Sequence, residues 1–560
     1  MATYLRYLGK VVIVTGGTRG IGPAIVREFV RQGAKVVFCS QASEVETGHA
    51  IQRELQDSGC PGEAYFHVCD VRNETEIKRL ILVTVERYGC LDCLVNAAGD
   101  VYSEKIDDVT AQSFRNLMEM NVVSYLLTSK YALPYLRETR GNIINLACIC
   151  GVIGAKHTVS NVTSKGAVIA MTKALAIDES KYGVRVNSLS PGNIWTPLSE
   201  KMANQSPDPE AAIQEIKDRQ LMGRYGTPEE VALGVLYLAA DGTFCTGFNL
   251  MISGGAEVGF GKKSEVDPEP GPSMSRMESY LRYPGKVVIV TGGTSGIGLA
   301  SVREFVRQGA KVVFCSRARG AKKGQAIQRE LQDSGCPGEA FYQVCDVRQE
   351  ADIKRLILAT IEHYGCLDCL VNTVGEIYYD KIDDVNAQDF CNLMKVNVVS
   401  SLLASKYSLP YLRETRGNII NIASLAGVYG VKNLLSYTTS KGAVIAMTKA
   451  LAIDESKYGV RVNCISPSGI WTPFLGKLLN QLPDPEAAIQ ETKDLQLMGR
   501  LGTPEEVALG ILYLAADGTF CTGFNLMLSG GAEVGFGKKS EVDPQHGPSV
   551  SGSSQDSSRK

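Results

Sequence analysis

Short runs of apolar and β-branched residues alternate along the chain with amphipathic stretches of helical period. In the first half this pattern predicts strands at 10–15, 35–39, 64–69, 93–96, 141–147, 184–190 and 249–252. Helices are expected between them, including 21–32, 44–57, 74–88, 111–135 and 162–182. Alternating strands and helices, joined by right-handed crossovers, form a parallel sheet covered on both faces. The predicted fold class is therefore α/β, with a doubly wound, Rossmann-type domain built on seven parallel strands.

The second half of the chain repeats the first. Residues 1–276 return as residues 277–552 at a constant offset of 276. Because solenoid repeats run to roughly 20–50 residues, a unit of this length indicates a duplicated domain. We expect domains at 1–261 and 277–537, a linker rich in Pro and Gly at 262–276, and a disordered tail at 538–560. Met277 aligns with Met1, which leaves open that two neighbouring reading frames have been joined.

Composition narrows the class of protein. An apolar content of 44% and a charged content of 21% are typical of a soluble globular protein. A net charge of −2 gives no electrostatic footprint for nucleic acid or for an anionic membrane, so we expect neither partner. The apolar runs are strand-sized and no signal segment opens the chain, which predicts a cytoplasmic protein.

The sixteen cysteines are predicted to be buried thiols, as in a reducing compartment. Two C-x-x-C pairs, Cys90 with Cys93 and Cys366 with Cys369, match part of a zinc or redox pattern. A tetrahedral zinc site needs four ligands, and neither a second pair nor a histidine pair stands nearby in the sequence. We therefore predict no metal.

A glycine-rich turn stands between the first strand and the first helix of each half. Because glycine has no side chain, such a turn lets the backbone approach a pyrophosphate at the N-terminus of the helix. The position after an apolar strand and before a helix makes the motif specific. We expect a dinucleotide to contact Gly292, Ser295, Gly296, Ile297 and Gly298 in the second half, and Gly16, Arg19, Gly20, Ile21 and Gly22 in the first.

The second half also carries a candidate catalytic set. Ser424, Tyr437 and Lys441 stand at spacings of 13 and 4, and the spacing of four puts Tyr437 and Lys441 on one face of a helix. Ser424 follows a strand, at the sheet edge where ligands bind in open α/β folds. A neighbouring ammonium lowers the pKa of a phenol from about 10 towards the operating pH. We predict that Tyr437 exchanges a proton with an alcohol or carbonyl whose oxygen Ser424 holds.

These motifs resemble the short-chain dehydrogenase/reductase family over nearly all of both halves. In the second half they are Thr-Gly-x-x-x-Gly-x-Gly, Asp346-Val347, Val371-Asn-Thr-Val-Gly375, Asn397, Ser424, Tyr437-x-x-x-Lys441 and Pro467-Ser-Gly-Ile-Trp-Thr-Pro473. The resemblance implies an NAD(P)-dependent oxidoreductase that acts on CH–OH donors.

The resemblance also implies a role for each matching residue of the second half. Tyr437 is the acid/base, Lys441 binds the ribose and lowers the pKa of the tyrosine, Ser424 orients the substrate oxygen, and Asn397 holds a water of the proton relay. Further nucleotide contacts are implied at Ser316, Arg317, Asp346, Val347, Asn372, Gly375, Ile470 and Thr472. Thr373-Val374 replaces the Asn-Ala that the family usually has.

The first half keeps the nucleotide positions and changes the catalytic ones. Cys148 replaces the serine and Asn161 replaces the tyrosine, and an amide does not titrate at neutral pH. Cys148 has no matching histidine base, so we interpret it as a small buried filler. We therefore predict a catalytically inactive, nucleotide-binding domain that retains Asp70, Val71, Asn96, Gly99, Asn121, Lys165, Ile194 and Thr196.

Cofactor preference depends on the end of the second strand. A carboxylate there would accept the adenosine ribose hydroxyls and repel a 2′-phosphate. The chain has Ser316-Arg317 in the second half and Ser40-Gln41 in the first, with no acid in either pair. Arg317, helped by Arg319, can pair with a phosphate. We favour NADP(H) in the second half, with NAD(H) possible, and leave the cofactor of the first half open.

The substrate is predicted to be a small molecule. Apolar and aromatic residues at 377–379 and 428–431 favour a steroid such as a 17β-hydroxysteroid, and L-fucose or another sugar alcohol is the alternative. Trp195 and Trp471 are as consistent with a pocket wall as with core packing. A nucleotide-binding pseudoenzyme scaffold is the competing class of function.

We also expect the two halves to associate with each other. Because the family pairs isologously through the helices that carry Asn397 and Tyr437, the helices at 111–135 and 162–182 and their twins are expected to form an intrachain pseudo-dimer, and further homo-oligomers are expected.

Overall fold

A computed structural model describes residues 5–102, 108–153, 155, 158–258, 281–380, 387–429, 431, 433–480 and 482–534. The predicted linker at 262–276 and the predicted tail at 538–560 lie outside the described residues.

The first half forms a seven-stranded parallel sheet in the order β3-β2-β1-β4-β5-β6-β7. Its strands are β1 Val11–Thr15, β2 Lys35–Ser40, β3 Glu63–Val68, β4 Cys93–Asn96, β5 Asn142–Leu146, β6 Arg185–Pro191 and β7 Asn249–Ile252. Its helices are α1 Gly22–Arg31, α2 Val45–Asp57, α3 Glu74–Tyr88, α4 Ala111–Met118, α5 Ser124–Thr139, α6 Cys150–Ile153, α7 Val159–Glu179, α8 Pro197–Asn204, α9 Pro209–Asp218 and α10 Pro228–Leu236. The order reverses between β1 and β4, and this switch point places the glycine-rich turn at the carboxyl edge of the sheet.

The second half repeats this topology, in the order β10-β9-β8-β11-β12-β13-β14. Its strands are β8 Val287–Thr291, β9 Lys311–Ser316, β10 Glu339–Val344, β11 Cys369–Asn372, β12 Asn418–Ile422, β13 Arg461–Pro467 and β14 Asn525–Leu528. Its helices are α11 Gly296–Arg307, α12 Ala321–Asp333, α13 Glu350–Tyr364, α14 Ala387–Met394, α15 Ser400–Thr415, α16 Ala426–Tyr429, α17 Leu435–Ser456, α18 Pro473–Leu479, α19 Pro485–Asp494 and α20 Pro504–Leu512. The predicted fold class, two tandem doubly wound domains with seven-stranded parallel sheets, is confirmed.

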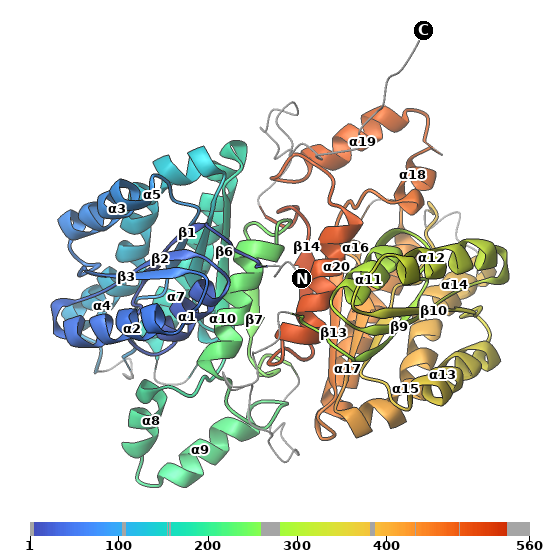
Figure 1. The fold of residues 1–560 in the computed structure, drawn as a ribbon, viewed down its shortest axis with the longest axis horizontal. Coiled ribbons are helices and arrows are strands. Elements are labelled where there is room, and N and C mark those ends of the chain that lie inside the picture. Colours follow the sequence, from blue (N-terminus) through green and yellow to red (C-terminus); the bar gives the residue numbers. More distant parts are fainter. Residues whose placement is uncertain are drawn as a thin grey trace.

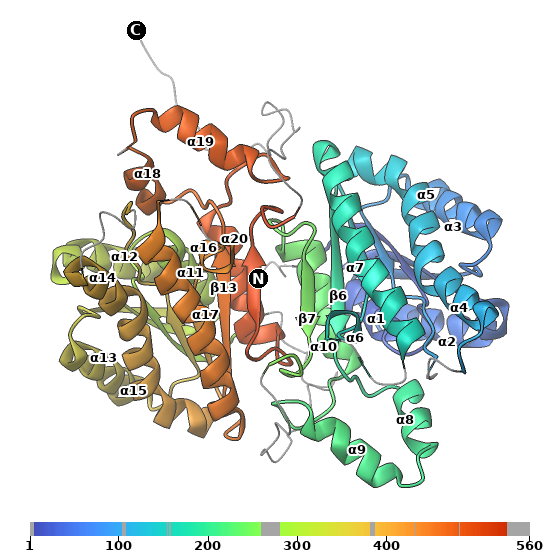
Figure 2. The ribbon, with the colours of Figure 1, turned by 180° about the vertical axis from the view of Figure 1, so that it is seen from behind.

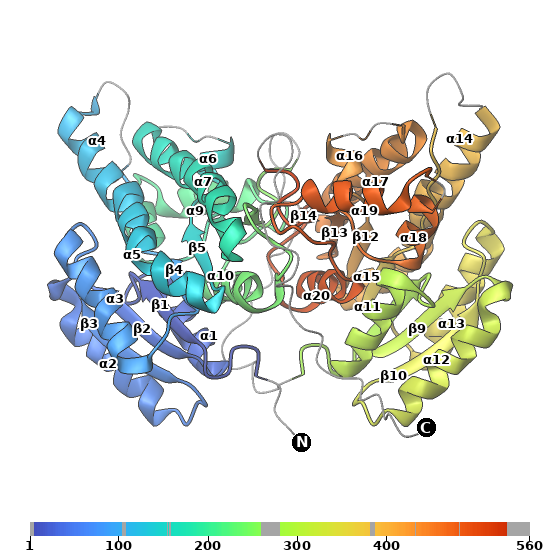
Figure 3. The ribbon, with the colours of Figure 1, turned by 90° about the horizontal axis from the view of Figure 1, so that it is seen from above.

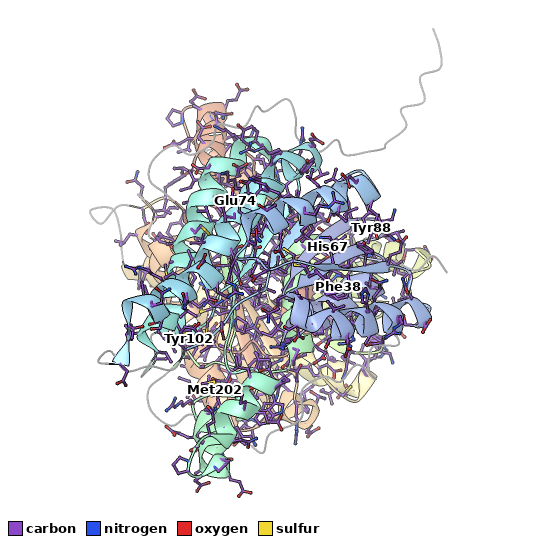
Figure 4. The ribbon with its side chains drawn as sticks, turned by 90° about the vertical axis from the view of Figure 1, so that its left-hand side faces the viewer. Phe38, His67, Glu74, Tyr88, Tyr102 and Met202 are labelled. Carbon is purple, nitrogen blue, oxygen red and sulfur yellow. The ribbon has the colours of Figure 1, made fainter. Side chains whose placement is uncertain are left out.

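Helices cover both faces of each sheet. In the first half α1, α2 and α10 pack their apolar residues on one face, and α3, α5 and the end of α7 pack on the other. The central strands β1, β4, β5 and β6 are buried along their whole length, as expected of parallel strands covered on both faces, whereas the edge strands β3 and β7 are partly exposed. Figure 4 views the first half from its outer side, where Phe38 of β2 and His67 of β3 are labelled beside Glu74 of α3. None of the described helices is long and apolar enough to cross a membrane.

The two halves meet at the edges of their sheets formed by β7 and β14, with α10 and α20 beside them (Figures 1 and 3). Tyr237 and Tyr513, which follow these helices, stack at a ring-centroid distance of 4.2 Å. Both rings are fully buried, and one hydrophobic cluster runs from the first half into the second. The contact therefore joins the halves through a shared apolar core.

Polar contacts across this interface occur in reciprocal pairs. Thr243 Oγ1 donates to Glu506 Oε1 at 2.8 Å, and Thr519 Oγ1 donates to Glu230 Oε1 at the same distance. The arginine–aspartate contacts also come in two copies, which Arg6 and Arg282 make with Asp241 and Asp517. Such exchanged contacts are those of an isologous, twofold interface.

The elements that meet differ from the expected ones. Figure 2 shows α5 and α15 on the outer parts of the molecule, while β7 and β14 lie near its centre in Figure 1. Phe244 and Phe520, in the loops before these strands, are fully buried across the interface. An apolar sheet edge needs to be covered, and the partner half covers it here.

Candidate functional site

The glycine-rich turn of the second half has the backbone shape that its sequence predicts. Gly292 and Gly296 have φ of +73° and +52°, values that residues with a side chain rarely adopt. A Cβ on Gly298 would lie 2.4 Å from the carbonyl oxygen of Gly292. A Cβ on Gly296 would lie 3.4 Å from Cγ2 of Thr472, so the turn faces the loop after β13 across a narrow gap. The turn accommodates glycine at these positions, and its backbone is free to approach a ligand.

A cavity of about 1410 Å³ begins at this turn and crosses the carboxyl edge of the second sheet. Most residues predicted for the site line it: Gly292, Ser295, Gly296, Ile297, Gly298, Ser316, Arg317, Asp346, Val347, Gly375, Ser424, Tyr437, Lys441, Ile470 and Thr472. These residues are brought together from across the second half, although they are spread over 181 positions of the sequence from 292 to 472.

Two predicted residues stand behind the cavity wall. Asn372 is buried, and its Nδ2 donates to Asn421 Oδ1 at 2.9 Å. Asn397 lies in a π-helical turn between α14 and α15, a feature that often marks functional sites. Its Nδ2 donates to the carbonyl of Glu376 and to Ser440 Oγ, both at 2.9 Å, while its Oδ1 accepts from the backbone of Glu376. Asn397 thus ties the loop after β11 to helix α17.

Tyr437 and Lys441 lie on one face of α17, as their spacing predicts, and both side chains are buried. The Lys441 nitrogen lies 5.8 Å from the centre of the Tyr437 ring and donates to the carbonyl of Ile422 at 2.8 Å. Ser424 is half-buried, and its Oγ accepts from the backbone of Ala426. A hydroxyl, a phenol and an ammonium therefore converge at the end of β12.

The pKa of Tyr437 differs from the prediction. Burial raises the pKa of the phenol above its ordinary value, and the hydrogen bond with Ser424 offsets part of that rise. Burial also lowers the pKa of Lys441 to about 8. The expected lowering of the tyrosine pKa by the ammonium is not found, because desolvation of both groups outweighs their interaction.

Cationic side chains gather at the far end of the cavity, beyond β9. Arg317, Arg319, Lys323 and Arg348 all line it, and Arg317 contacts Glu376 at 3.5 Å. Arg348 pairs with Asp346 and, by that hydrogen bond, holds the pKa of the carboxyl below its ordinary value. Sequence reasoning identified Arg317 and Arg319, and it missed Lys323 and Arg348 because they belong to a different helix and loop.

The opposite end of the cavity is mainly apolar. The expected aromatic segments contribute Ile377, Tyr379, Tyr429 and Val431, whereas Gly430 lies outside the described residues. Trp471 is 52% exposed and does not line the cavity, so neither of its two interpretations holds. Trp195 is also exposed and packs against Tyr225. Sequence analysis missed the residues of α18 that form this wall, namely Phe474, Leu475, Leu478 and Leu479.

The first half also reaches this apolar end. Lys173 and Ile177, on helix α7, line the cavity of the second half. The segment that follows β14 lines it as well, through Ala532, Glu533 and Val534. Val534 in turn packs against the first half, because a Cβ on Gly247 would lie 2.5 Å from its Cγ2. The first half therefore borders the cavity that holds the candidate catalytic residues of the second half.

The first half builds the corresponding framework from its own residues. Gly16 and Gly20 have positive φ, and a Cβ on Gly22 would lie 2.0 Å from the carbonyl oxygen of Gly16. Asn121 bonds Ser164, and Lys165 Nζ donates to the carbonyl of Leu146 at 2.9 Å. The remaining predicted residues keep the places of their twins: Ile21, Asp70, Val71, Asn96, Gly99, Ile194 and Thr196.

The first half departs from the second at three points. Arg19 forms an ion pair with Glu44, a buried carboxylate at the position of Gly320. Asn161 is buried at the tyrosine position, and its Nδ2 donates to Cys150 Sγ at 3.3 Å. Cys148 is half-buried, and its interpretation as a small filler stays a prediction. The described residues contain no group of three or more His, Cys, Asp or Glu side chains suited to a metal ion.

Both halves match family models of dehydrogenases or reductases, and both resemble known proteins of that kind. Residues 286–482 match the family model described as short chain dehydrogenase, and residues 16–257 match one described as enoyl-(acyl carrier protein) reductase. L-fucose dehydrogenase of Bos taurus is 49% identical over 275 residues, 49% of this chain and 99% of that protein. L-fucose dehydrogenase of Mus musculus is 48% identical over 265 residues, 47% of this chain and 94% of that protein. An uncharacterized short-chain type dehydrogenase/reductase of Sinorhizobium fredii is 25% identical over 550 residues, 96% of this chain and 94% of that protein.

Solved structures align with one half at a time. The aldohexose dehydrogenase of Thermoplasma acidophilum is 34% identical, with a TM-score of 0.40, over 45% of this chain and 96% of that structure. A variant of actinorhodin polyketide ketoreductase with NADPH is 32% identical, with a TM-score of 0.42, over 44% of this chain and 97% of that structure.

Proposed function

Because the chain belongs to the short-chain dehydrogenase/reductase family and is an oxidoreductase of the NAD(P)-binding type, we propose that its second half is the catalytic unit. This unit interconverts a secondary alcohol and a ketone. The observation that carries the proposal is the convergence of Ser424, Tyr437 and Lys441 on one cavity, against Cys148 and Asn161 at the same positions of the first half.

The chemistry follows from the placement of these groups. A bound nicotinamide supplies the acceptor or donor of hydride at the carbinol carbon. Ser424 holds the substrate oxygen, and Tyr437 takes its proton during oxidation and returns it during reduction. Lys441, as a cation, binds the nucleotide ribose. Asn397 is the positioning residue, because it fixes α17 through Ser440.

The cofactor of the second half is proposed to be NADP(H). Arg317, Arg319 and Lys323 surround the end of the cavity beyond β9, where the adenosine ribose of a dinucleotide would lie. A guanidinium pairs well with a phosphate dianion, whereas NAD(H) offers this cluster no anion there. The first half has Gln41, Ser43 and Thr47 at the same positions, and Glu44 beside them. A dinucleotide bound by the first half would therefore be NAD(H).

Two classes of substrate are each supported by one observation. The apolar wall formed by Phe474, Leu478 and Leu479 favours a bulky alcohol of the 17β-hydroxysteroid type. The identity of 48–49% with L-fucose dehydrogenases favours L-fucose or a related sugar alcohol. Both classes present a ring carbon with a secondary hydroxyl, so the chemistry of Tyr437 serves either one.

The first half is proposed to act as a scaffold for the second. It borders the apolar end of the cavity through Lys173 and Ile177, and it anchors the segment that ends at Val534. This role uses the intrachain interface already described and needs no turnover by the first half. Further association of whole chains is part of the same proposal, through the helix faces of α5 and α15 that this interface leaves outside.

The test is a substrate and cofactor panel with the full chain. We expect turnover of a 17β-hydroxysteroid or of L-fucose with NADP⁺, with a higher kcat/KM than with NAD⁺. The double variant Cys148→Ser with Asn161→Tyr gives the first half the residues of the second. Its turnover on the same panel is compared with that of the parent chain. An enzyme that turns over no alcohol while its second half binds NADPH would favour a nucleotide-binding scaffold instead.

A further inference from the structure

Two neighbouring thiols occupy the first half where the second half has Ser424 and Ala426. Cys148 follows strand β5, and Cys150 begins helix α6. The backbone N–H of Cys150 lies 3.5 Å from Cys148 Sγ and donates to it, and the two thiols are hydrogen-bonded to each other. In the first half this site therefore contains a pair of thiols and has no tyrosine.

The two sulfurs differ in exposure and in acidity. Cys148 is half-buried, whereas Cys150 is 7% exposed. The hydrogen bond from Cys150 and the ammonium of Lys165 lower the pKa of Cys148. The same hydrogen bond and burial raise the pKa of Cys150. Cys148, the more exposed residue of the two, is thus the one whose thiol ionises more readily, and Cys150 keeps its proton.

Asn161 completes the site. Its Nδ2 donates to Cys150 Sγ at 3.3 Å, which orients that sulfur beside Cys148. Its Oδ1 is buried, and it has no hydrogen-bond partner among the described residues. A buried acceptor of this kind is normally satisfied, and its state here indicates a group that is supplied from outside. A ligand with a donor hydrogen, such as a peptide amide or an amine, would satisfy it.

We propose that this pair is a thiol–disulfide site, in which Cys148 attacks a low-molecular-weight disulfide and Cys150 resolves the product. This assignment is independent of the activity proposed for the second half. It also gives the Asn161 substitution a use, because an amide can orient a thiol where a phenol would have filled the space.

The reaction is balanced by the groups present. The thiolate of Cys148 forms a bond with one sulfur of the small disulfide RSSR, and the bond between its two sulfurs breaks to release RS⁻. Cys150 gives up its proton, so this leaving group departs as RSH. The sulfur of Cys150 then attacks Cys148 Sγ, and the second RS⁻ leaves and takes up the proton that Cys148 lost on ionisation. The two thiols are oxidised to one protein disulfide, and RSSR is reduced to two RSH.

Two other pairs of thiols are in contact in the described residues, and they differ from this pair in exposure. Cys39 contacts Cys69, and Cys315 contacts Cys345, in the equivalent strands of the two halves. All four of these side chains are buried, with exposures of 2% or less. A disulfide in solution has no access to them, whereas Cys148 is partly exposed.

The experiment uses the full chain and oxidised glutathione as the probe. Cleavage after Arg140 and Lys156 releases peptide 141–156, whose cysteines are Cys148 and Cys150 alone. Under non-reducing conditions we expect this peptide to lose two hydrogen atoms and to carry no adduct. The variant Cys150→Ala, which copies Ala426 of the second half, should stop at the mixed disulfide of Cys148 with glutathione. The variant Cys148→Ser, which copies Ser424, should leave Cys150 unmodified.

Alkylation by iodoacetamide at a series of pH values gives a second measurement. The rate at Cys148 should reach half its maximum below neutral pH, whereas a short unstructured cysteine peptide in the same solution should have its midpoint at about pH 8.5. In Cys150→Ala the midpoint at Cys148 should move upwards, because the hydrogen bond from Cys150 is lost. The proposal is overturned if peptide 141–156 stays reduced while the exposed Cys391 is glutathionylated, or if Cys148 titrates like the unstructured cysteine peptide.

Discussion

Lys441 lies beneath Tyr437 on helix α17, with its nitrogen 5.8 Å from the centre of the phenol ring. The same helix position in the first half pairs Lys165 with Asn161, so the two halves keep the lysine and differ in the group that it serves. We propose that this difference separates nucleotide binding, expected of both halves, from proton transfer, which requires the phenol.

Replacement of Tyr437 by phenylalanine tests this separation. We expect Tyr437→Phe to lower kcat by about 10²–10⁴-fold, because general acid–base catalysis contributes that much. Quenching of protein fluorescence by NADPH should still report binding within a few-fold of the parent. Asn161→Ala, the matched change in the first half, should leave kcat unaltered. Equal losses in the two variants would assign the chemistry to both halves.

Replacement of Lys441 by methionine should abolish activity and yet raise the stability of the fold. Burial lowers the folded-state pKa of Lys441 to about 8 from an unfolded value of about 10.4, so the charged form is disfavoured in the fold. The free-energy cost of burying the Lys441 charge is absent above the unfolded-state pKa. It is complete once the pH falls below the folded-state pKa. At pH 7 Lys441→Met should therefore raise the free energy of unfolding by roughly 1–3 kcal/mol while activity is lost.

Urea denaturation at pH 7 and at pH 10 measures this effect. The gain in stability should shrink towards zero at the higher pH, where the parent lysine is neutral in the folded state. A variant that is destabilised at both pH values would mean that the hydrogen bond to Ile422 outweighs the cost of burying the charge.

Replacement of Arg317 tests the cofactor. We expect Arg317→Gln, which installs the residue of the first half, to lower kcat/KM for NADPH by about tenfold or more, since hydrogen bonds to charged groups contribute roughly 1.5–3 kcal/mol. Arg317→Asp should lower it further and improve the relative use of NADH, because a carboxylate repels the 2′-phosphate. Arg303→Gln, an exposed arginine on α11 outside the cavity lining, is the charge-matched control. An unchanged NADPH/NADH ratio in both Arg317 variants would remove this residue from 2′-phosphate recognition.

The sequence predicts the sheets and the glycine-rich turn because both depend on local patterns. The buried strands are continuous apolar runs, and Gly292 and Gly296 have the positive φ that their motif requires. The spacing of Tyr437 and Lys441 likewise determines that they share a helix face. Each of these features is decided within a few residues.

Features that depend on burial between distant segments were not predictable. The pKa of Tyr437 is raised because several elements enclose it, and no spacing in the sequence reports that enclosure. The stacking of Tyr237 on Tyr513 joins identical residues 276 positions apart, so neither sequence segment signals its partner. The approach of Ile177 to the second cavity follows from that same docking.

The interface between the halves should be sensitive to its buried charges. Burial tends to raise the pKa of the Asp517 carboxyl, but Arg282 and Arg6 outweigh burial and hold it below its ordinary value. Removal of one member of a buried ion pair costs about 3–5 kcal/mol, and we expect Asp517→Ala to show a loss in this range by urea denaturation. Glu330→Ala, which breaks the exposed pair with Arg303, should cost about 0–1 kcal/mol.

The pH dependence of this interface has a definite sign. Because the folded-state pKa of Asp517 is depressed, its contribution is complete above the unfolded value of about 3.9 and is lost as pH falls through the folded value. The stability difference between the parent and Asp517→Ala should therefore narrow in acid. A constant difference between pH 7 and pH 3 would mean that the carboxylate is not what stabilises the contact.

The contribution of the first half to the second cavity is tested at Ile177. This side chain is 41% exposed and lines the apolar end of the cavity, on the opposite side of the interface from Tyr437. Ile177→Asp places a carboxylate in the lining of a cavity end that is mainly apolar. We expect KM for the alcohol to rise about tenfold, because roughly 1.5 kcal/mol of apolar contact is lost, with kcat and NADPH binding nearly unchanged. Ile453→Asp, the equivalent change on α17, is the matched control because Ile453 is similarly exposed and does not line this cavity. A rise in KM for Ile177→Asp alone supports a cavity completed by both halves, and equal kinetics for the two variants would confine substrate binding to the second half.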